Sequence, residues 1–173
     1  MKRILLTVLI ALVAGFASAQ TEKGGWMVGA SVANLNYGLT DKDFSLDLTP
    51  QAGYFISDNV ALGGQLLLSV YSPKDGESLT SWGIAPFVRG YFGGTEKGKF
   101  FGQGNVGFVG SSFDDETTTA FALGATAGYA YFITRNVSLE TGLGYSYSKA
   151  KDFDGSSNLG LNFGFQIYLG GKK

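Results

Sequence analysis

The chain has 173 residues and a formal net charge of −1, and it contains neither histidine nor cysteine. It therefore lacks the residues of common zinc sites, of a Ser-His-Asp triad and of a Cys-His nucleophile, and we expect no catalytic residue, no metal and no cofactor. A sequence pI near 5.3 leaves no basic patch, which argues against a nucleic-acid partner.

Residues 1–19 have the parts of a secretory signal peptide. Lys2 and Arg3 precede an apolar run from residue 4 to residue 16, and Ala17-Ser18-Ala19 supplies the small residues of a cleavage site. The run is shorter than the roughly 20 apolar residues that a membrane-spanning helix needs, so an uncleaved anchor is the weaker alternative. We predict cleavage after Ala19 and one mature domain, residues 20–173.

Alternation of apolar and polar residues with a period of two recurs along the mature chain. In one clear example Phe44, Leu46 and Leu48 share one face, and Ser45 and Asp47 share the other. Alternation and turn residues together predict eight strands, each long enough for a tilted membrane span. These strands cover residues 25–36, 44–55, 60–71, 81–92, 99–112, 119–132, 137–148 and 158–169. The predicted fold is all-β, an eight-stranded antiparallel up-and-down transmembrane β-barrel.

The second face of these strands is polar but almost uncharged. Only Asp47, Arg89 and Glu140 carry a charge within the strand interiors. Because a water-soluble barrel normally exposes charged residues, we predict that the apolar face contacts lipid and the polar face lines the bore. The predicted lipid-facing residues are Val60, Leu62, Leu66, Leu68, Val70, Ile84, Pro86, Val88, Phe121, Leu123, Ala125, Ala127, Val137, Leu139, Leu143, Leu159, Leu161, Phe163, Phe165, Ile167 and Leu169. A soluble lipocalin-like carrier, with the two faces exchanged, is the alternative.

Two prolines and three Tyr-Phe pairs interrupt the regular pattern. Pro50 and Pro86 lie inside predicted strands, where each removes a backbone donor, so we expect a β-bulge at each. Alternation places Tyr54 and Tyr131 on the lipid side but Tyr91 on the bore side. A one-residue bulge in the fourth strand would explain this difference.

The charged strand residues predict a site inside the bore. Arg89 and Glu140 fall at similar depth, and pairing is the expected solution for two ions in so narrow an interior. Asp47 lies nearer the outer end as a further ion-pair candidate. Amide side chains form the predicted luminal polar network: Gln51, Gln65, Gln103, Asn105, Asn162 and Gln166. Such a network can plug and stabilise the barrel, or it can gate a conductance.

Several motifs resemble those of a known family. Residues 86–92, Pro-Phe-Val-Arg-Gly-Tyr-Phe, look like an arginine-bearing barrel strand, and Tyr-Phe-Ile-[Ser/Thr]-x-Asn-Val occurs at 54–60 and again at 131–137. The last strand is similar to the assembly signal read by the barrel-insertion machinery, at Asn162, Gly164, Ile167 and Leu169. The mature chain therefore resembles the small eight-stranded outer-membrane β-barrel family of Gram-negative bacteria, the OmpA/OmpX-like outer membrane protein beta-barrel domain.

The resemblance implies an integral protein of the cell outer membrane, exported by its signal peptide and not an enzyme. The expected role is structural or surface-interacting, with the lumen filled by side chains and the chain a monomer. The expected partners are outer-membrane lipid and lipopolysaccharide, besides the barrel-insertion machinery. The alternative is a narrow channel or conduit for small ions or apolar molecules across the outer membrane, with apolar molecules leaving sideways through the wall.

Two loop motifs match ligand sites only in part. Asp152 and Asp154 precede Gly155 as in a calcium loop, but the remaining ligands and the closing glutamate are absent, so a solvated loop is the preferred interpretation. The acidic run 114–116 is a candidate for divalent cations shared with lipopolysaccharide. A solvated loop tip is again the simpler alternative.

Overall fold

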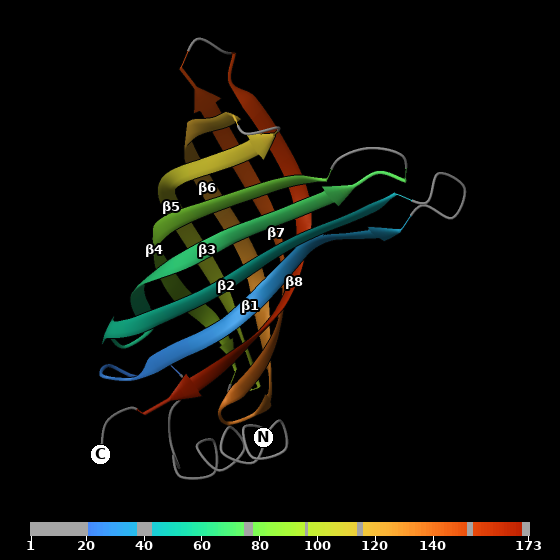
Figure 1. Ribbon diagram of the computed structural model, residues 1–173. Helices are drawn as coiled ribbons and strands as arrows, with labels where there is room; N and C mark the ends of the chain where they lie inside the picture. The colour runs from blue at the N-terminus through green and yellow to red at the C-terminus, as the bar shows by residue number, and fades with distance from the viewer. Residues whose placement is uncertain are drawn as a thin grey trace, which may run out of the picture.

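The computed structural model describes residues 21–37, 43–74, 78–95, 97–113, 116–151 and 154–170. These residues form eight β-strands: β1 (Trp26–Tyr37), β2 (Phe44–Ser57), β3 (Val60–Ser72), β4 (Leu79–Thr95), β5 (Gly98–Phe113), β6 (Glu116–Thr134), β7 (Val137–Ala150) and β8 (Ser156–Leu169). Each strand pairs antiparallel with the next and β8 pairs with β1, which closes the barrel (Figure 1). The predicted fold is confirmed, and every strand begins and ends within three residues of its predicted range. Among the described residues, no helix is long and apolar enough to cross a membrane.

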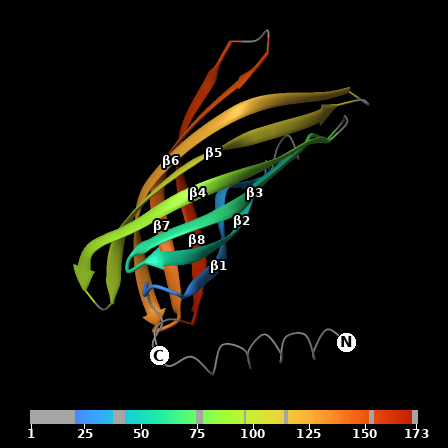
Figure 2. The same cartoon turned by 90° about the vertical axis from the view of Figure 1, so that its left-hand side faces the viewer.

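The two ends of the barrel differ in their connections. Short turns join β2 to β3, β4 to β5 and β6 to β7 at what we call the turn end, where β1 begins and β8 finishes. The remaining connections lie at the opposite end, called here the loop end, where the β7–β8 hairpin projects beyond its neighbours (Figure 2).

The repeated asparagine of the two Tyr-Phe-Ile motifs ties each turn to a later strand. The backbone N–H of Tyr91 donates to the Asn59 carbonyl at 2.8 Å, and that of Tyr168 donates to the Asn136 carbonyl at 2.7 Å. Asn59 has a φ of 68°, a left-handed conformation that asparagine tolerates better than most residues. The turns therefore fix the backbone beside two tyrosines that face the bore.

The apolar rows lie on the outside of the barrel, as predicted. Thirteen of the large predicted lipid-facing side chains are between 40% and 68% exposed: Leu62, Leu66, Leu68, Ile84, Val88, Phe121, Leu123, Leu139, Leu143, Leu159, Leu161, Phe163 and Phe165. Their sequence neighbours Ala61, Gln65 and Arg89 are buried inside. This orientation is opposite to the one that a soluble lipocalin-like carrier requires.

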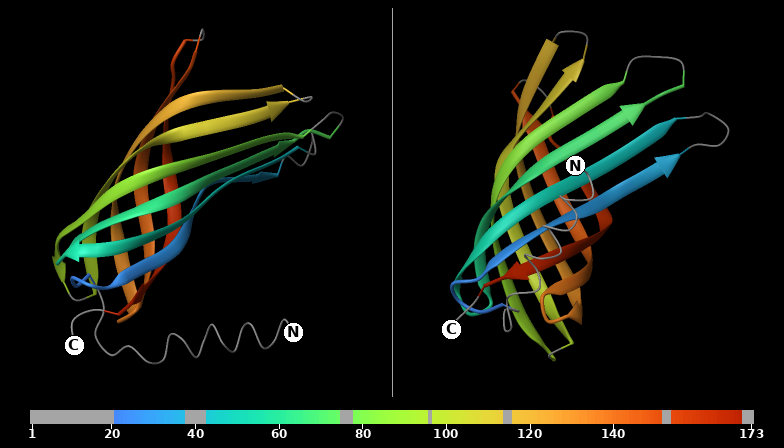
Figure 3. Two further views of the ribbon diagram at one scale, coloured as in Figure 1. Left: turned by 60° about the vertical axis from the view of Figure 1, so that its left-hand side comes forward. Right: turned by 60° about the horizontal axis from the view of Figure 1, so that its bottom comes forward.

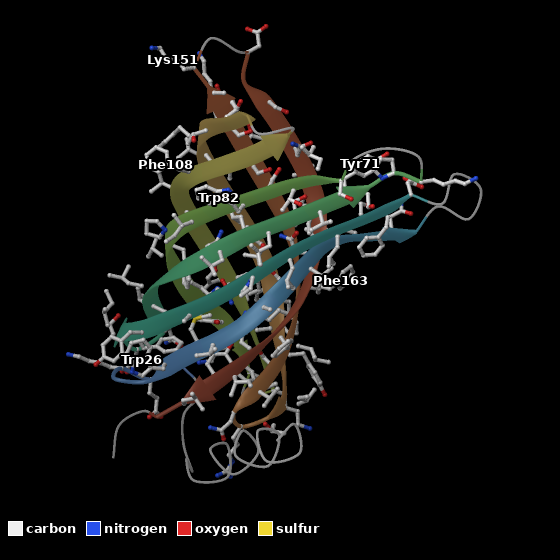
Figure 4. All side chains as sticks on the ribbon, in the orientation of Figure 1. Trp26, Tyr71, Trp82, Phe108, Lys151 and Phe163 are labelled. Atoms are coloured by element: carbon white, nitrogen blue, oxygen red, sulfur yellow. The ribbon has the colours of Figure 1, made fainter. Side chains whose placement is uncertain are left out.

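Exposed aromatic side chains gather toward both ends of the wall. Near the turn end, Trp26 contacts Tyr54 with ring centroids 5.2 Å apart. Toward the loop end, Phe108 contacts Phe121 at 6.0 Å. Figure 4 shows Trp26 at the lower end and Trp82 and Phe108 higher on the same wall. This arrangement matches the two interfacial girdles of a membrane barrel.

The bulges expected at the two prolines are absent. The register between β2 and β3 has the same offset on both sides of Pro50, and the register between β4 and β5 has the same offset on both sides of Pro86. Each backbone N–H of a strand points to only one neighbour, so a proline interrupts pairing on one side and leaves the other ladder intact. Pro50 accordingly stays paired with Ala30, and Pro86 with Gly64.

The fourth strand also needs no bulge to place Tyr91 inside. Tyr91 is 5% exposed, and its pairing with Phe101 continues without a shift to the pair Phe92 and Phe100. The register shifts only beyond Phe92. The bulge explanation was therefore wrong: β4 directs the tyrosine of its Tyr-Phe pair inward, whereas β2 directs Tyr54 outward.

The seam between β1 and β8 is the shortest ladder in the barrel. It runs through seven pairs, from Trp26 with Leu169 to Val32 with Phe163. Beyond Val32 the register of β1 against β2 shifts, and a bulge of this kind bends a strand. Farther up, β1 remains paired with β2 and β8 with β7, but the two strands diverge (Figure 3). We call the stretch of wall between residues 33–37 and 156–162, where no ladder joins β1 to β8, the upper gap.

Candidate functional site

Arg89 and Glu140 meet across the bore. Arg89 extends from β4 and Glu140 from β7, and they are 3% and 8% exposed. Arg89 Nη1 lies 2.8 Å from Glu140 Oε2 and 2.9 Å from Oε1, so one nitrogen donates to both carboxylate oxygens. The structure brings together the two residues that the sequence suggested as a pair. Because the interior excludes most water, each ion depends on the other for its stability.

Four of the predicted amide side chains surround this ion pair. Arg89 Nε donates to Gln103 Oε1 at 2.6 Å, and Gln103 Nε2 donates to Gln65 Oε1 at 2.8 Å and to Gln51 Oε1 at 3.4 Å. On the other side, Gln166 Nε2 donates to Glu140 Oε2 at 3.5 Å. The chain of bonds crosses the bore from β2 and β3 to β7 and β8.

Two tyrosines and a serine complete the network. Alternation along the sequence placed Tyr91 on the bore side, but none of these three residues was included in the predicted network. Arg89 Nη1 donates to the Tyr91 hydroxyl at 3.1 Å, and that hydroxyl lies 3.0 Å from the Tyr168 hydroxyl. Tyr168 in turn donates to Glu140 Oε1 at 3.4 Å, with Ser138 Oγ 3.2 Å from the Tyr168 hydroxyl. The same alternation, counted from the predicted lipid-facing Ile167, would also have placed Tyr168 in the bore.

Below the network, toward the turn end, apolar side chains fill the barrel. We call this layer the aromatic floor; it consists of Met27, Phe55, Ala61, Phe87, Tyr91, Phe101, Ala130, Phe132 and Tyr168. The guanidinium carbon of Arg89 lies 4.3 Å from the Phe101 ring centroid, a cation–π distance. The expectation of a polar lining throughout was wrong here, because the strand ends direct one member of each Tyr-Phe pair inward.

Above the network, toward the loop end, the bore is open. A cavity of about 610 Å³, which we call the upper chamber, begins at the Arg89 and Glu140 layer. Its walls include Thr49, Asn105, Thr126, Ser146 and Asn162. The predicted side-chain filling of the lumen is therefore found only in the half near the turn end.

The remaining predicted luminal residues lie in the chamber wall, away from the ion pair. Asp47 accepts a hydrogen bond from Ser69 Oγ at 2.5 Å and forms no ion pair within the described residues. An added Cβ on Gly124 would lie 2.5 Å from the Asn105 side chain, and one on Gly144 equally close to Asn162. These glycines make room for the two amides.

The proposed assembly-signal residues all lie on β8. Gly164 packs so closely on β1 that an added Cβ would lie 2.7 Å from the Ala30 carbonyl oxygen. Ile167 and Leu169 pair with β1 at the turn end, while Asn162 lies above the seam. Their reading by the insertion machinery remains a prediction.

The two candidate loop sites, for which a solvated loop was the preferred interpretation, fall mostly outside the described residues and are not tested. Within the described ranges, no cluster of three or more aspartate, glutamate, histidine or cysteine side chains could hold a metal ion. Asp152, Asp114 and Asp115 lie outside the described residues, as does the predicted signal peptide, residues 1–19.

Comparison with solved structures identifies the architecture. Neisserial surface protein A has a TM-score of 0.58 at 19% identity, over 87% of this chain and 99% of that one. Outer membrane protein H of P. aeruginosa has a TM-score of 0.61 at 16% identity, over 84% and 99%. Outer membrane protein OprG from Pseudomonas aeruginosa has a TM-score of 0.53 at 10% identity, over 88% of this chain and 99% of that one. No family model and no curated protein matches the sequence. The chain shares the fold of small eight-stranded outer-membrane β-barrels.

Proposed function

We propose that this protein is an integral outer-membrane β-barrel with a structural or surface-interaction role. The exposed apolar rows and the aromatic girdles support a lipid environment. In this proposal the signal peptide exports the chain, the insertion machinery reads β8, and a monomer contacts outer-membrane lipid and lipopolysaccharide through its wall and loops.

The observation that carries the proposal is the closure of the bore near the turn end. The ion pair of Arg89 and Glu140 lies directly on the aromatic floor, whose members Phe55 and Tyr168 are 1% and 0% exposed. An eight-stranded barrel is only wide enough for side chains to fill its interior, so these two buried layers support a bore that is closed to ions near the turn end.

A non-enzymatic role is part of the same proposal. The buried hydroxyl groups of Tyr91, Tyr168 and Ser138 are bonded to each other and to the ion pair. Glu140 is engaged by Arg89 at 2.8 Å, so it is not an accessible base.

The competing function is a narrow channel gated by the same ion pair, and conductance distinguishes the two. The purified protein in a planar lipid bilayer is expected to show no steady current above the bare membrane, while a general porin in the same bilayer conducts. A steady ion-selective current that changes on Glu140→Gln would contradict the proposal and favour the channel.

A further inference from the structure

The upper gap begins within the predicted lipid-contacting part of the wall. The seam between β1 and β8 contains seven paired residues. At about 3.3 Å per residue and a strand tilt of about 40°, the seam rises roughly 15–18 Å along the barrel axis, whereas the apolar band of a membrane barrel is about 25 Å tall. Phe163 marks the top of the seam (Figure 4), and the apolar outer face of β8 continues above it through Leu161 and Leu159, 59% and 68% exposed. Tyr145, an exposed aromatic residue, pairs with Leu159. The gap therefore opens toward the outer part of the hydrocarbon.

Unpaired strand edges at this depth need hydrogen-bonding partners. Above Val32 and Phe163 the facing edges of β1 and β8 form no ladder with each other. Hydrocarbon cannot satisfy backbone N–H and C=O groups, and unpaired backbone at membrane depth occurs only where it is buried in protein or lines a water-filled cavity. The upper chamber is that cavity, since it contacts Ser31 and Ala33 on β1 and Asn158 and Gly160 on β8.

The chamber wall selects for an uncharged polar group. Its lining contains both apolar and polar side chains, and most of the polar ones are uncharged, among them Thr49, Gln51, Asn105, Thr126, Asn158 and Asn162. Arg89 and Glu140 at its base neutralise each other, which leaves Asp47 as the unpaired charge of the lining. A single carboxylate disfavours an anionic group and is too little to hold a cation. The volume of about 610 Å³ lies in the range of small-molecule sites.

We propose that the upper chamber binds a neutral amphiphile, with its polyhydroxyl or amide head in the chamber and its hydrocarbon chain passing through the upper gap into the outer leaflet. The head supplies hydrogen bonds to the chamber amides and to the open strand edges. The chain continues along Leu159 and Leu161 on the outer face of β8. Water alone satisfies the edges equally but gives no reason for binding an apolar chain, so it is the competing occupant.

Octyl glucoside is a suitable probe, with glucose as the head alone and octanol as the chain alone. The chain contains no cysteine, so a single Ser146→Cys carries an environment-sensitive bimane label in the chamber wall. The full protein is placed in phosphatidylcholine nanodiscs and titrated with each probe. Octyl glucoside is expected to change the bimane emission saturably, with an apparent affinity at least about tenfold above that of glucose or octanol.

Two adjacent residues of β6 provide the matched variants. Thr126 lines the chamber, whereas Ala127 is exposed on the lipid-facing side. Thr126→Phe is expected to weaken octyl glucoside binding about tenfold or more, whereas Ala127→Phe leaves it unchanged. Thr49→Phe fills the chamber from β2 and should weaken binding too, so the result does not depend on one variant folding.

Three outcomes would overturn the site: no saturable change, equal effects of Thr126→Phe and Ala127→Phe, or glucose binding as tightly as octyl glucoside. The last outcome would show that the upper chamber is a hydrated cavity that binds the sugar head without any contribution from a hydrocarbon chain in the upper gap. The proposed structural role is judged separately by conductance, and a silent barrel that fails to bind octyl glucoside refutes this site alone.

Discussion

Replacing Arg89 by alanine will lower the free energy of unfolding by about 3–5 kcal/mol, the usual cost of removing one partner of a buried ion pair. Arg89 is 3% exposed and bonds to Glu140, Gln103 and Tyr91 together. Without it, the Glu140 carboxylate stays buried with only the long hydrogen bonds from Gln166, Tyr168 and Ser138, at 3.5, 3.4 and 3.5 Å. Urea unfolding in detergent, followed by the fluorescence of the two tryptophans, measures the change.

The control for this variant is Arg135→Ala, because Arg135 is exposed in the β6–β7 turn. It should change the free energy of unfolding by less than about 0.5 kcal/mol, as most surface substitutions do.

Glu140→Ala should destabilise the barrel as Arg89→Ala does. In the double variant, the decrease in the free energy of unfolding should be smaller than the sum of the two single decreases by at least about 1 kcal/mol. Strict additivity would show that the two charges do not stabilise each other.

Replacing Phe55 by alanine will lower the free energy of unfolding by about 3–5 kcal/mol, because a large cavity opens in a packed interior. Phe55 is 1% exposed in the aromatic floor, with its ring centroid 6.0 Å from that of Tyr91 and 6.2 Å from that of Tyr168. The rings around it are held by backbone ties to the turns and cannot collapse fully into the space. Urea unfolding in the same detergent measures the loss.

Phe92→Ala is the matched control, since it removes the same side chain from the opposite face of the wall. Phe92 is 60% exposed and contacts Phe100 at 6.2 Å. Detergent or lipid fills the vacated space there, so no cavity remains and the loss should be less than half of that for Phe55→Ala. Equal losses for the two variants would mean that Phe55 does not face a packed interior.

Period-two alternation was enough to predict the strands, the outward apolar rows and the inward position of Arg89 and Glu140. It works because successive side chains of a strand must point to opposite faces, and each face here meets a different solvent. The opposite directions of the two strands, together with the positions of Arg89 and Glu140 along them, predicted that the two residues lie at similar depth. The same rule predicts Phe55 and Tyr168 inside, but the expectation of a wholly polar lining obscured their role.

Other features depend on pairing between strands, which alternation within one strand does not specify. Pro50 and Pro86 keep their register because only one of the two neighbouring ladders loses a donor. The short seam follows from a bulge beyond Val32 that nothing in the local composition of β1 marks. The upper chamber exists because the aromatic floor fills only one half of the bore, a packing outcome between strands far apart in sequence.

The most direct test of this account asks which solvent each face of the wall meets. Single cysteines at Leu66, Leu161 and Thr126 carry nitroxide labels, and the protein is reconstituted in phospholipid vesicles. Labels at Leu66 and Leu161, both exposed on the outside, should collide mainly with oxygen, which concentrates in hydrocarbon. The label at Thr126, in the chamber wall, should collide mainly with a water-soluble nickel chelate. The reverse pattern, with nickel at Leu66 and Leu161 and oxygen at Thr126, would contradict a lipid-facing apolar wall around a polar chamber.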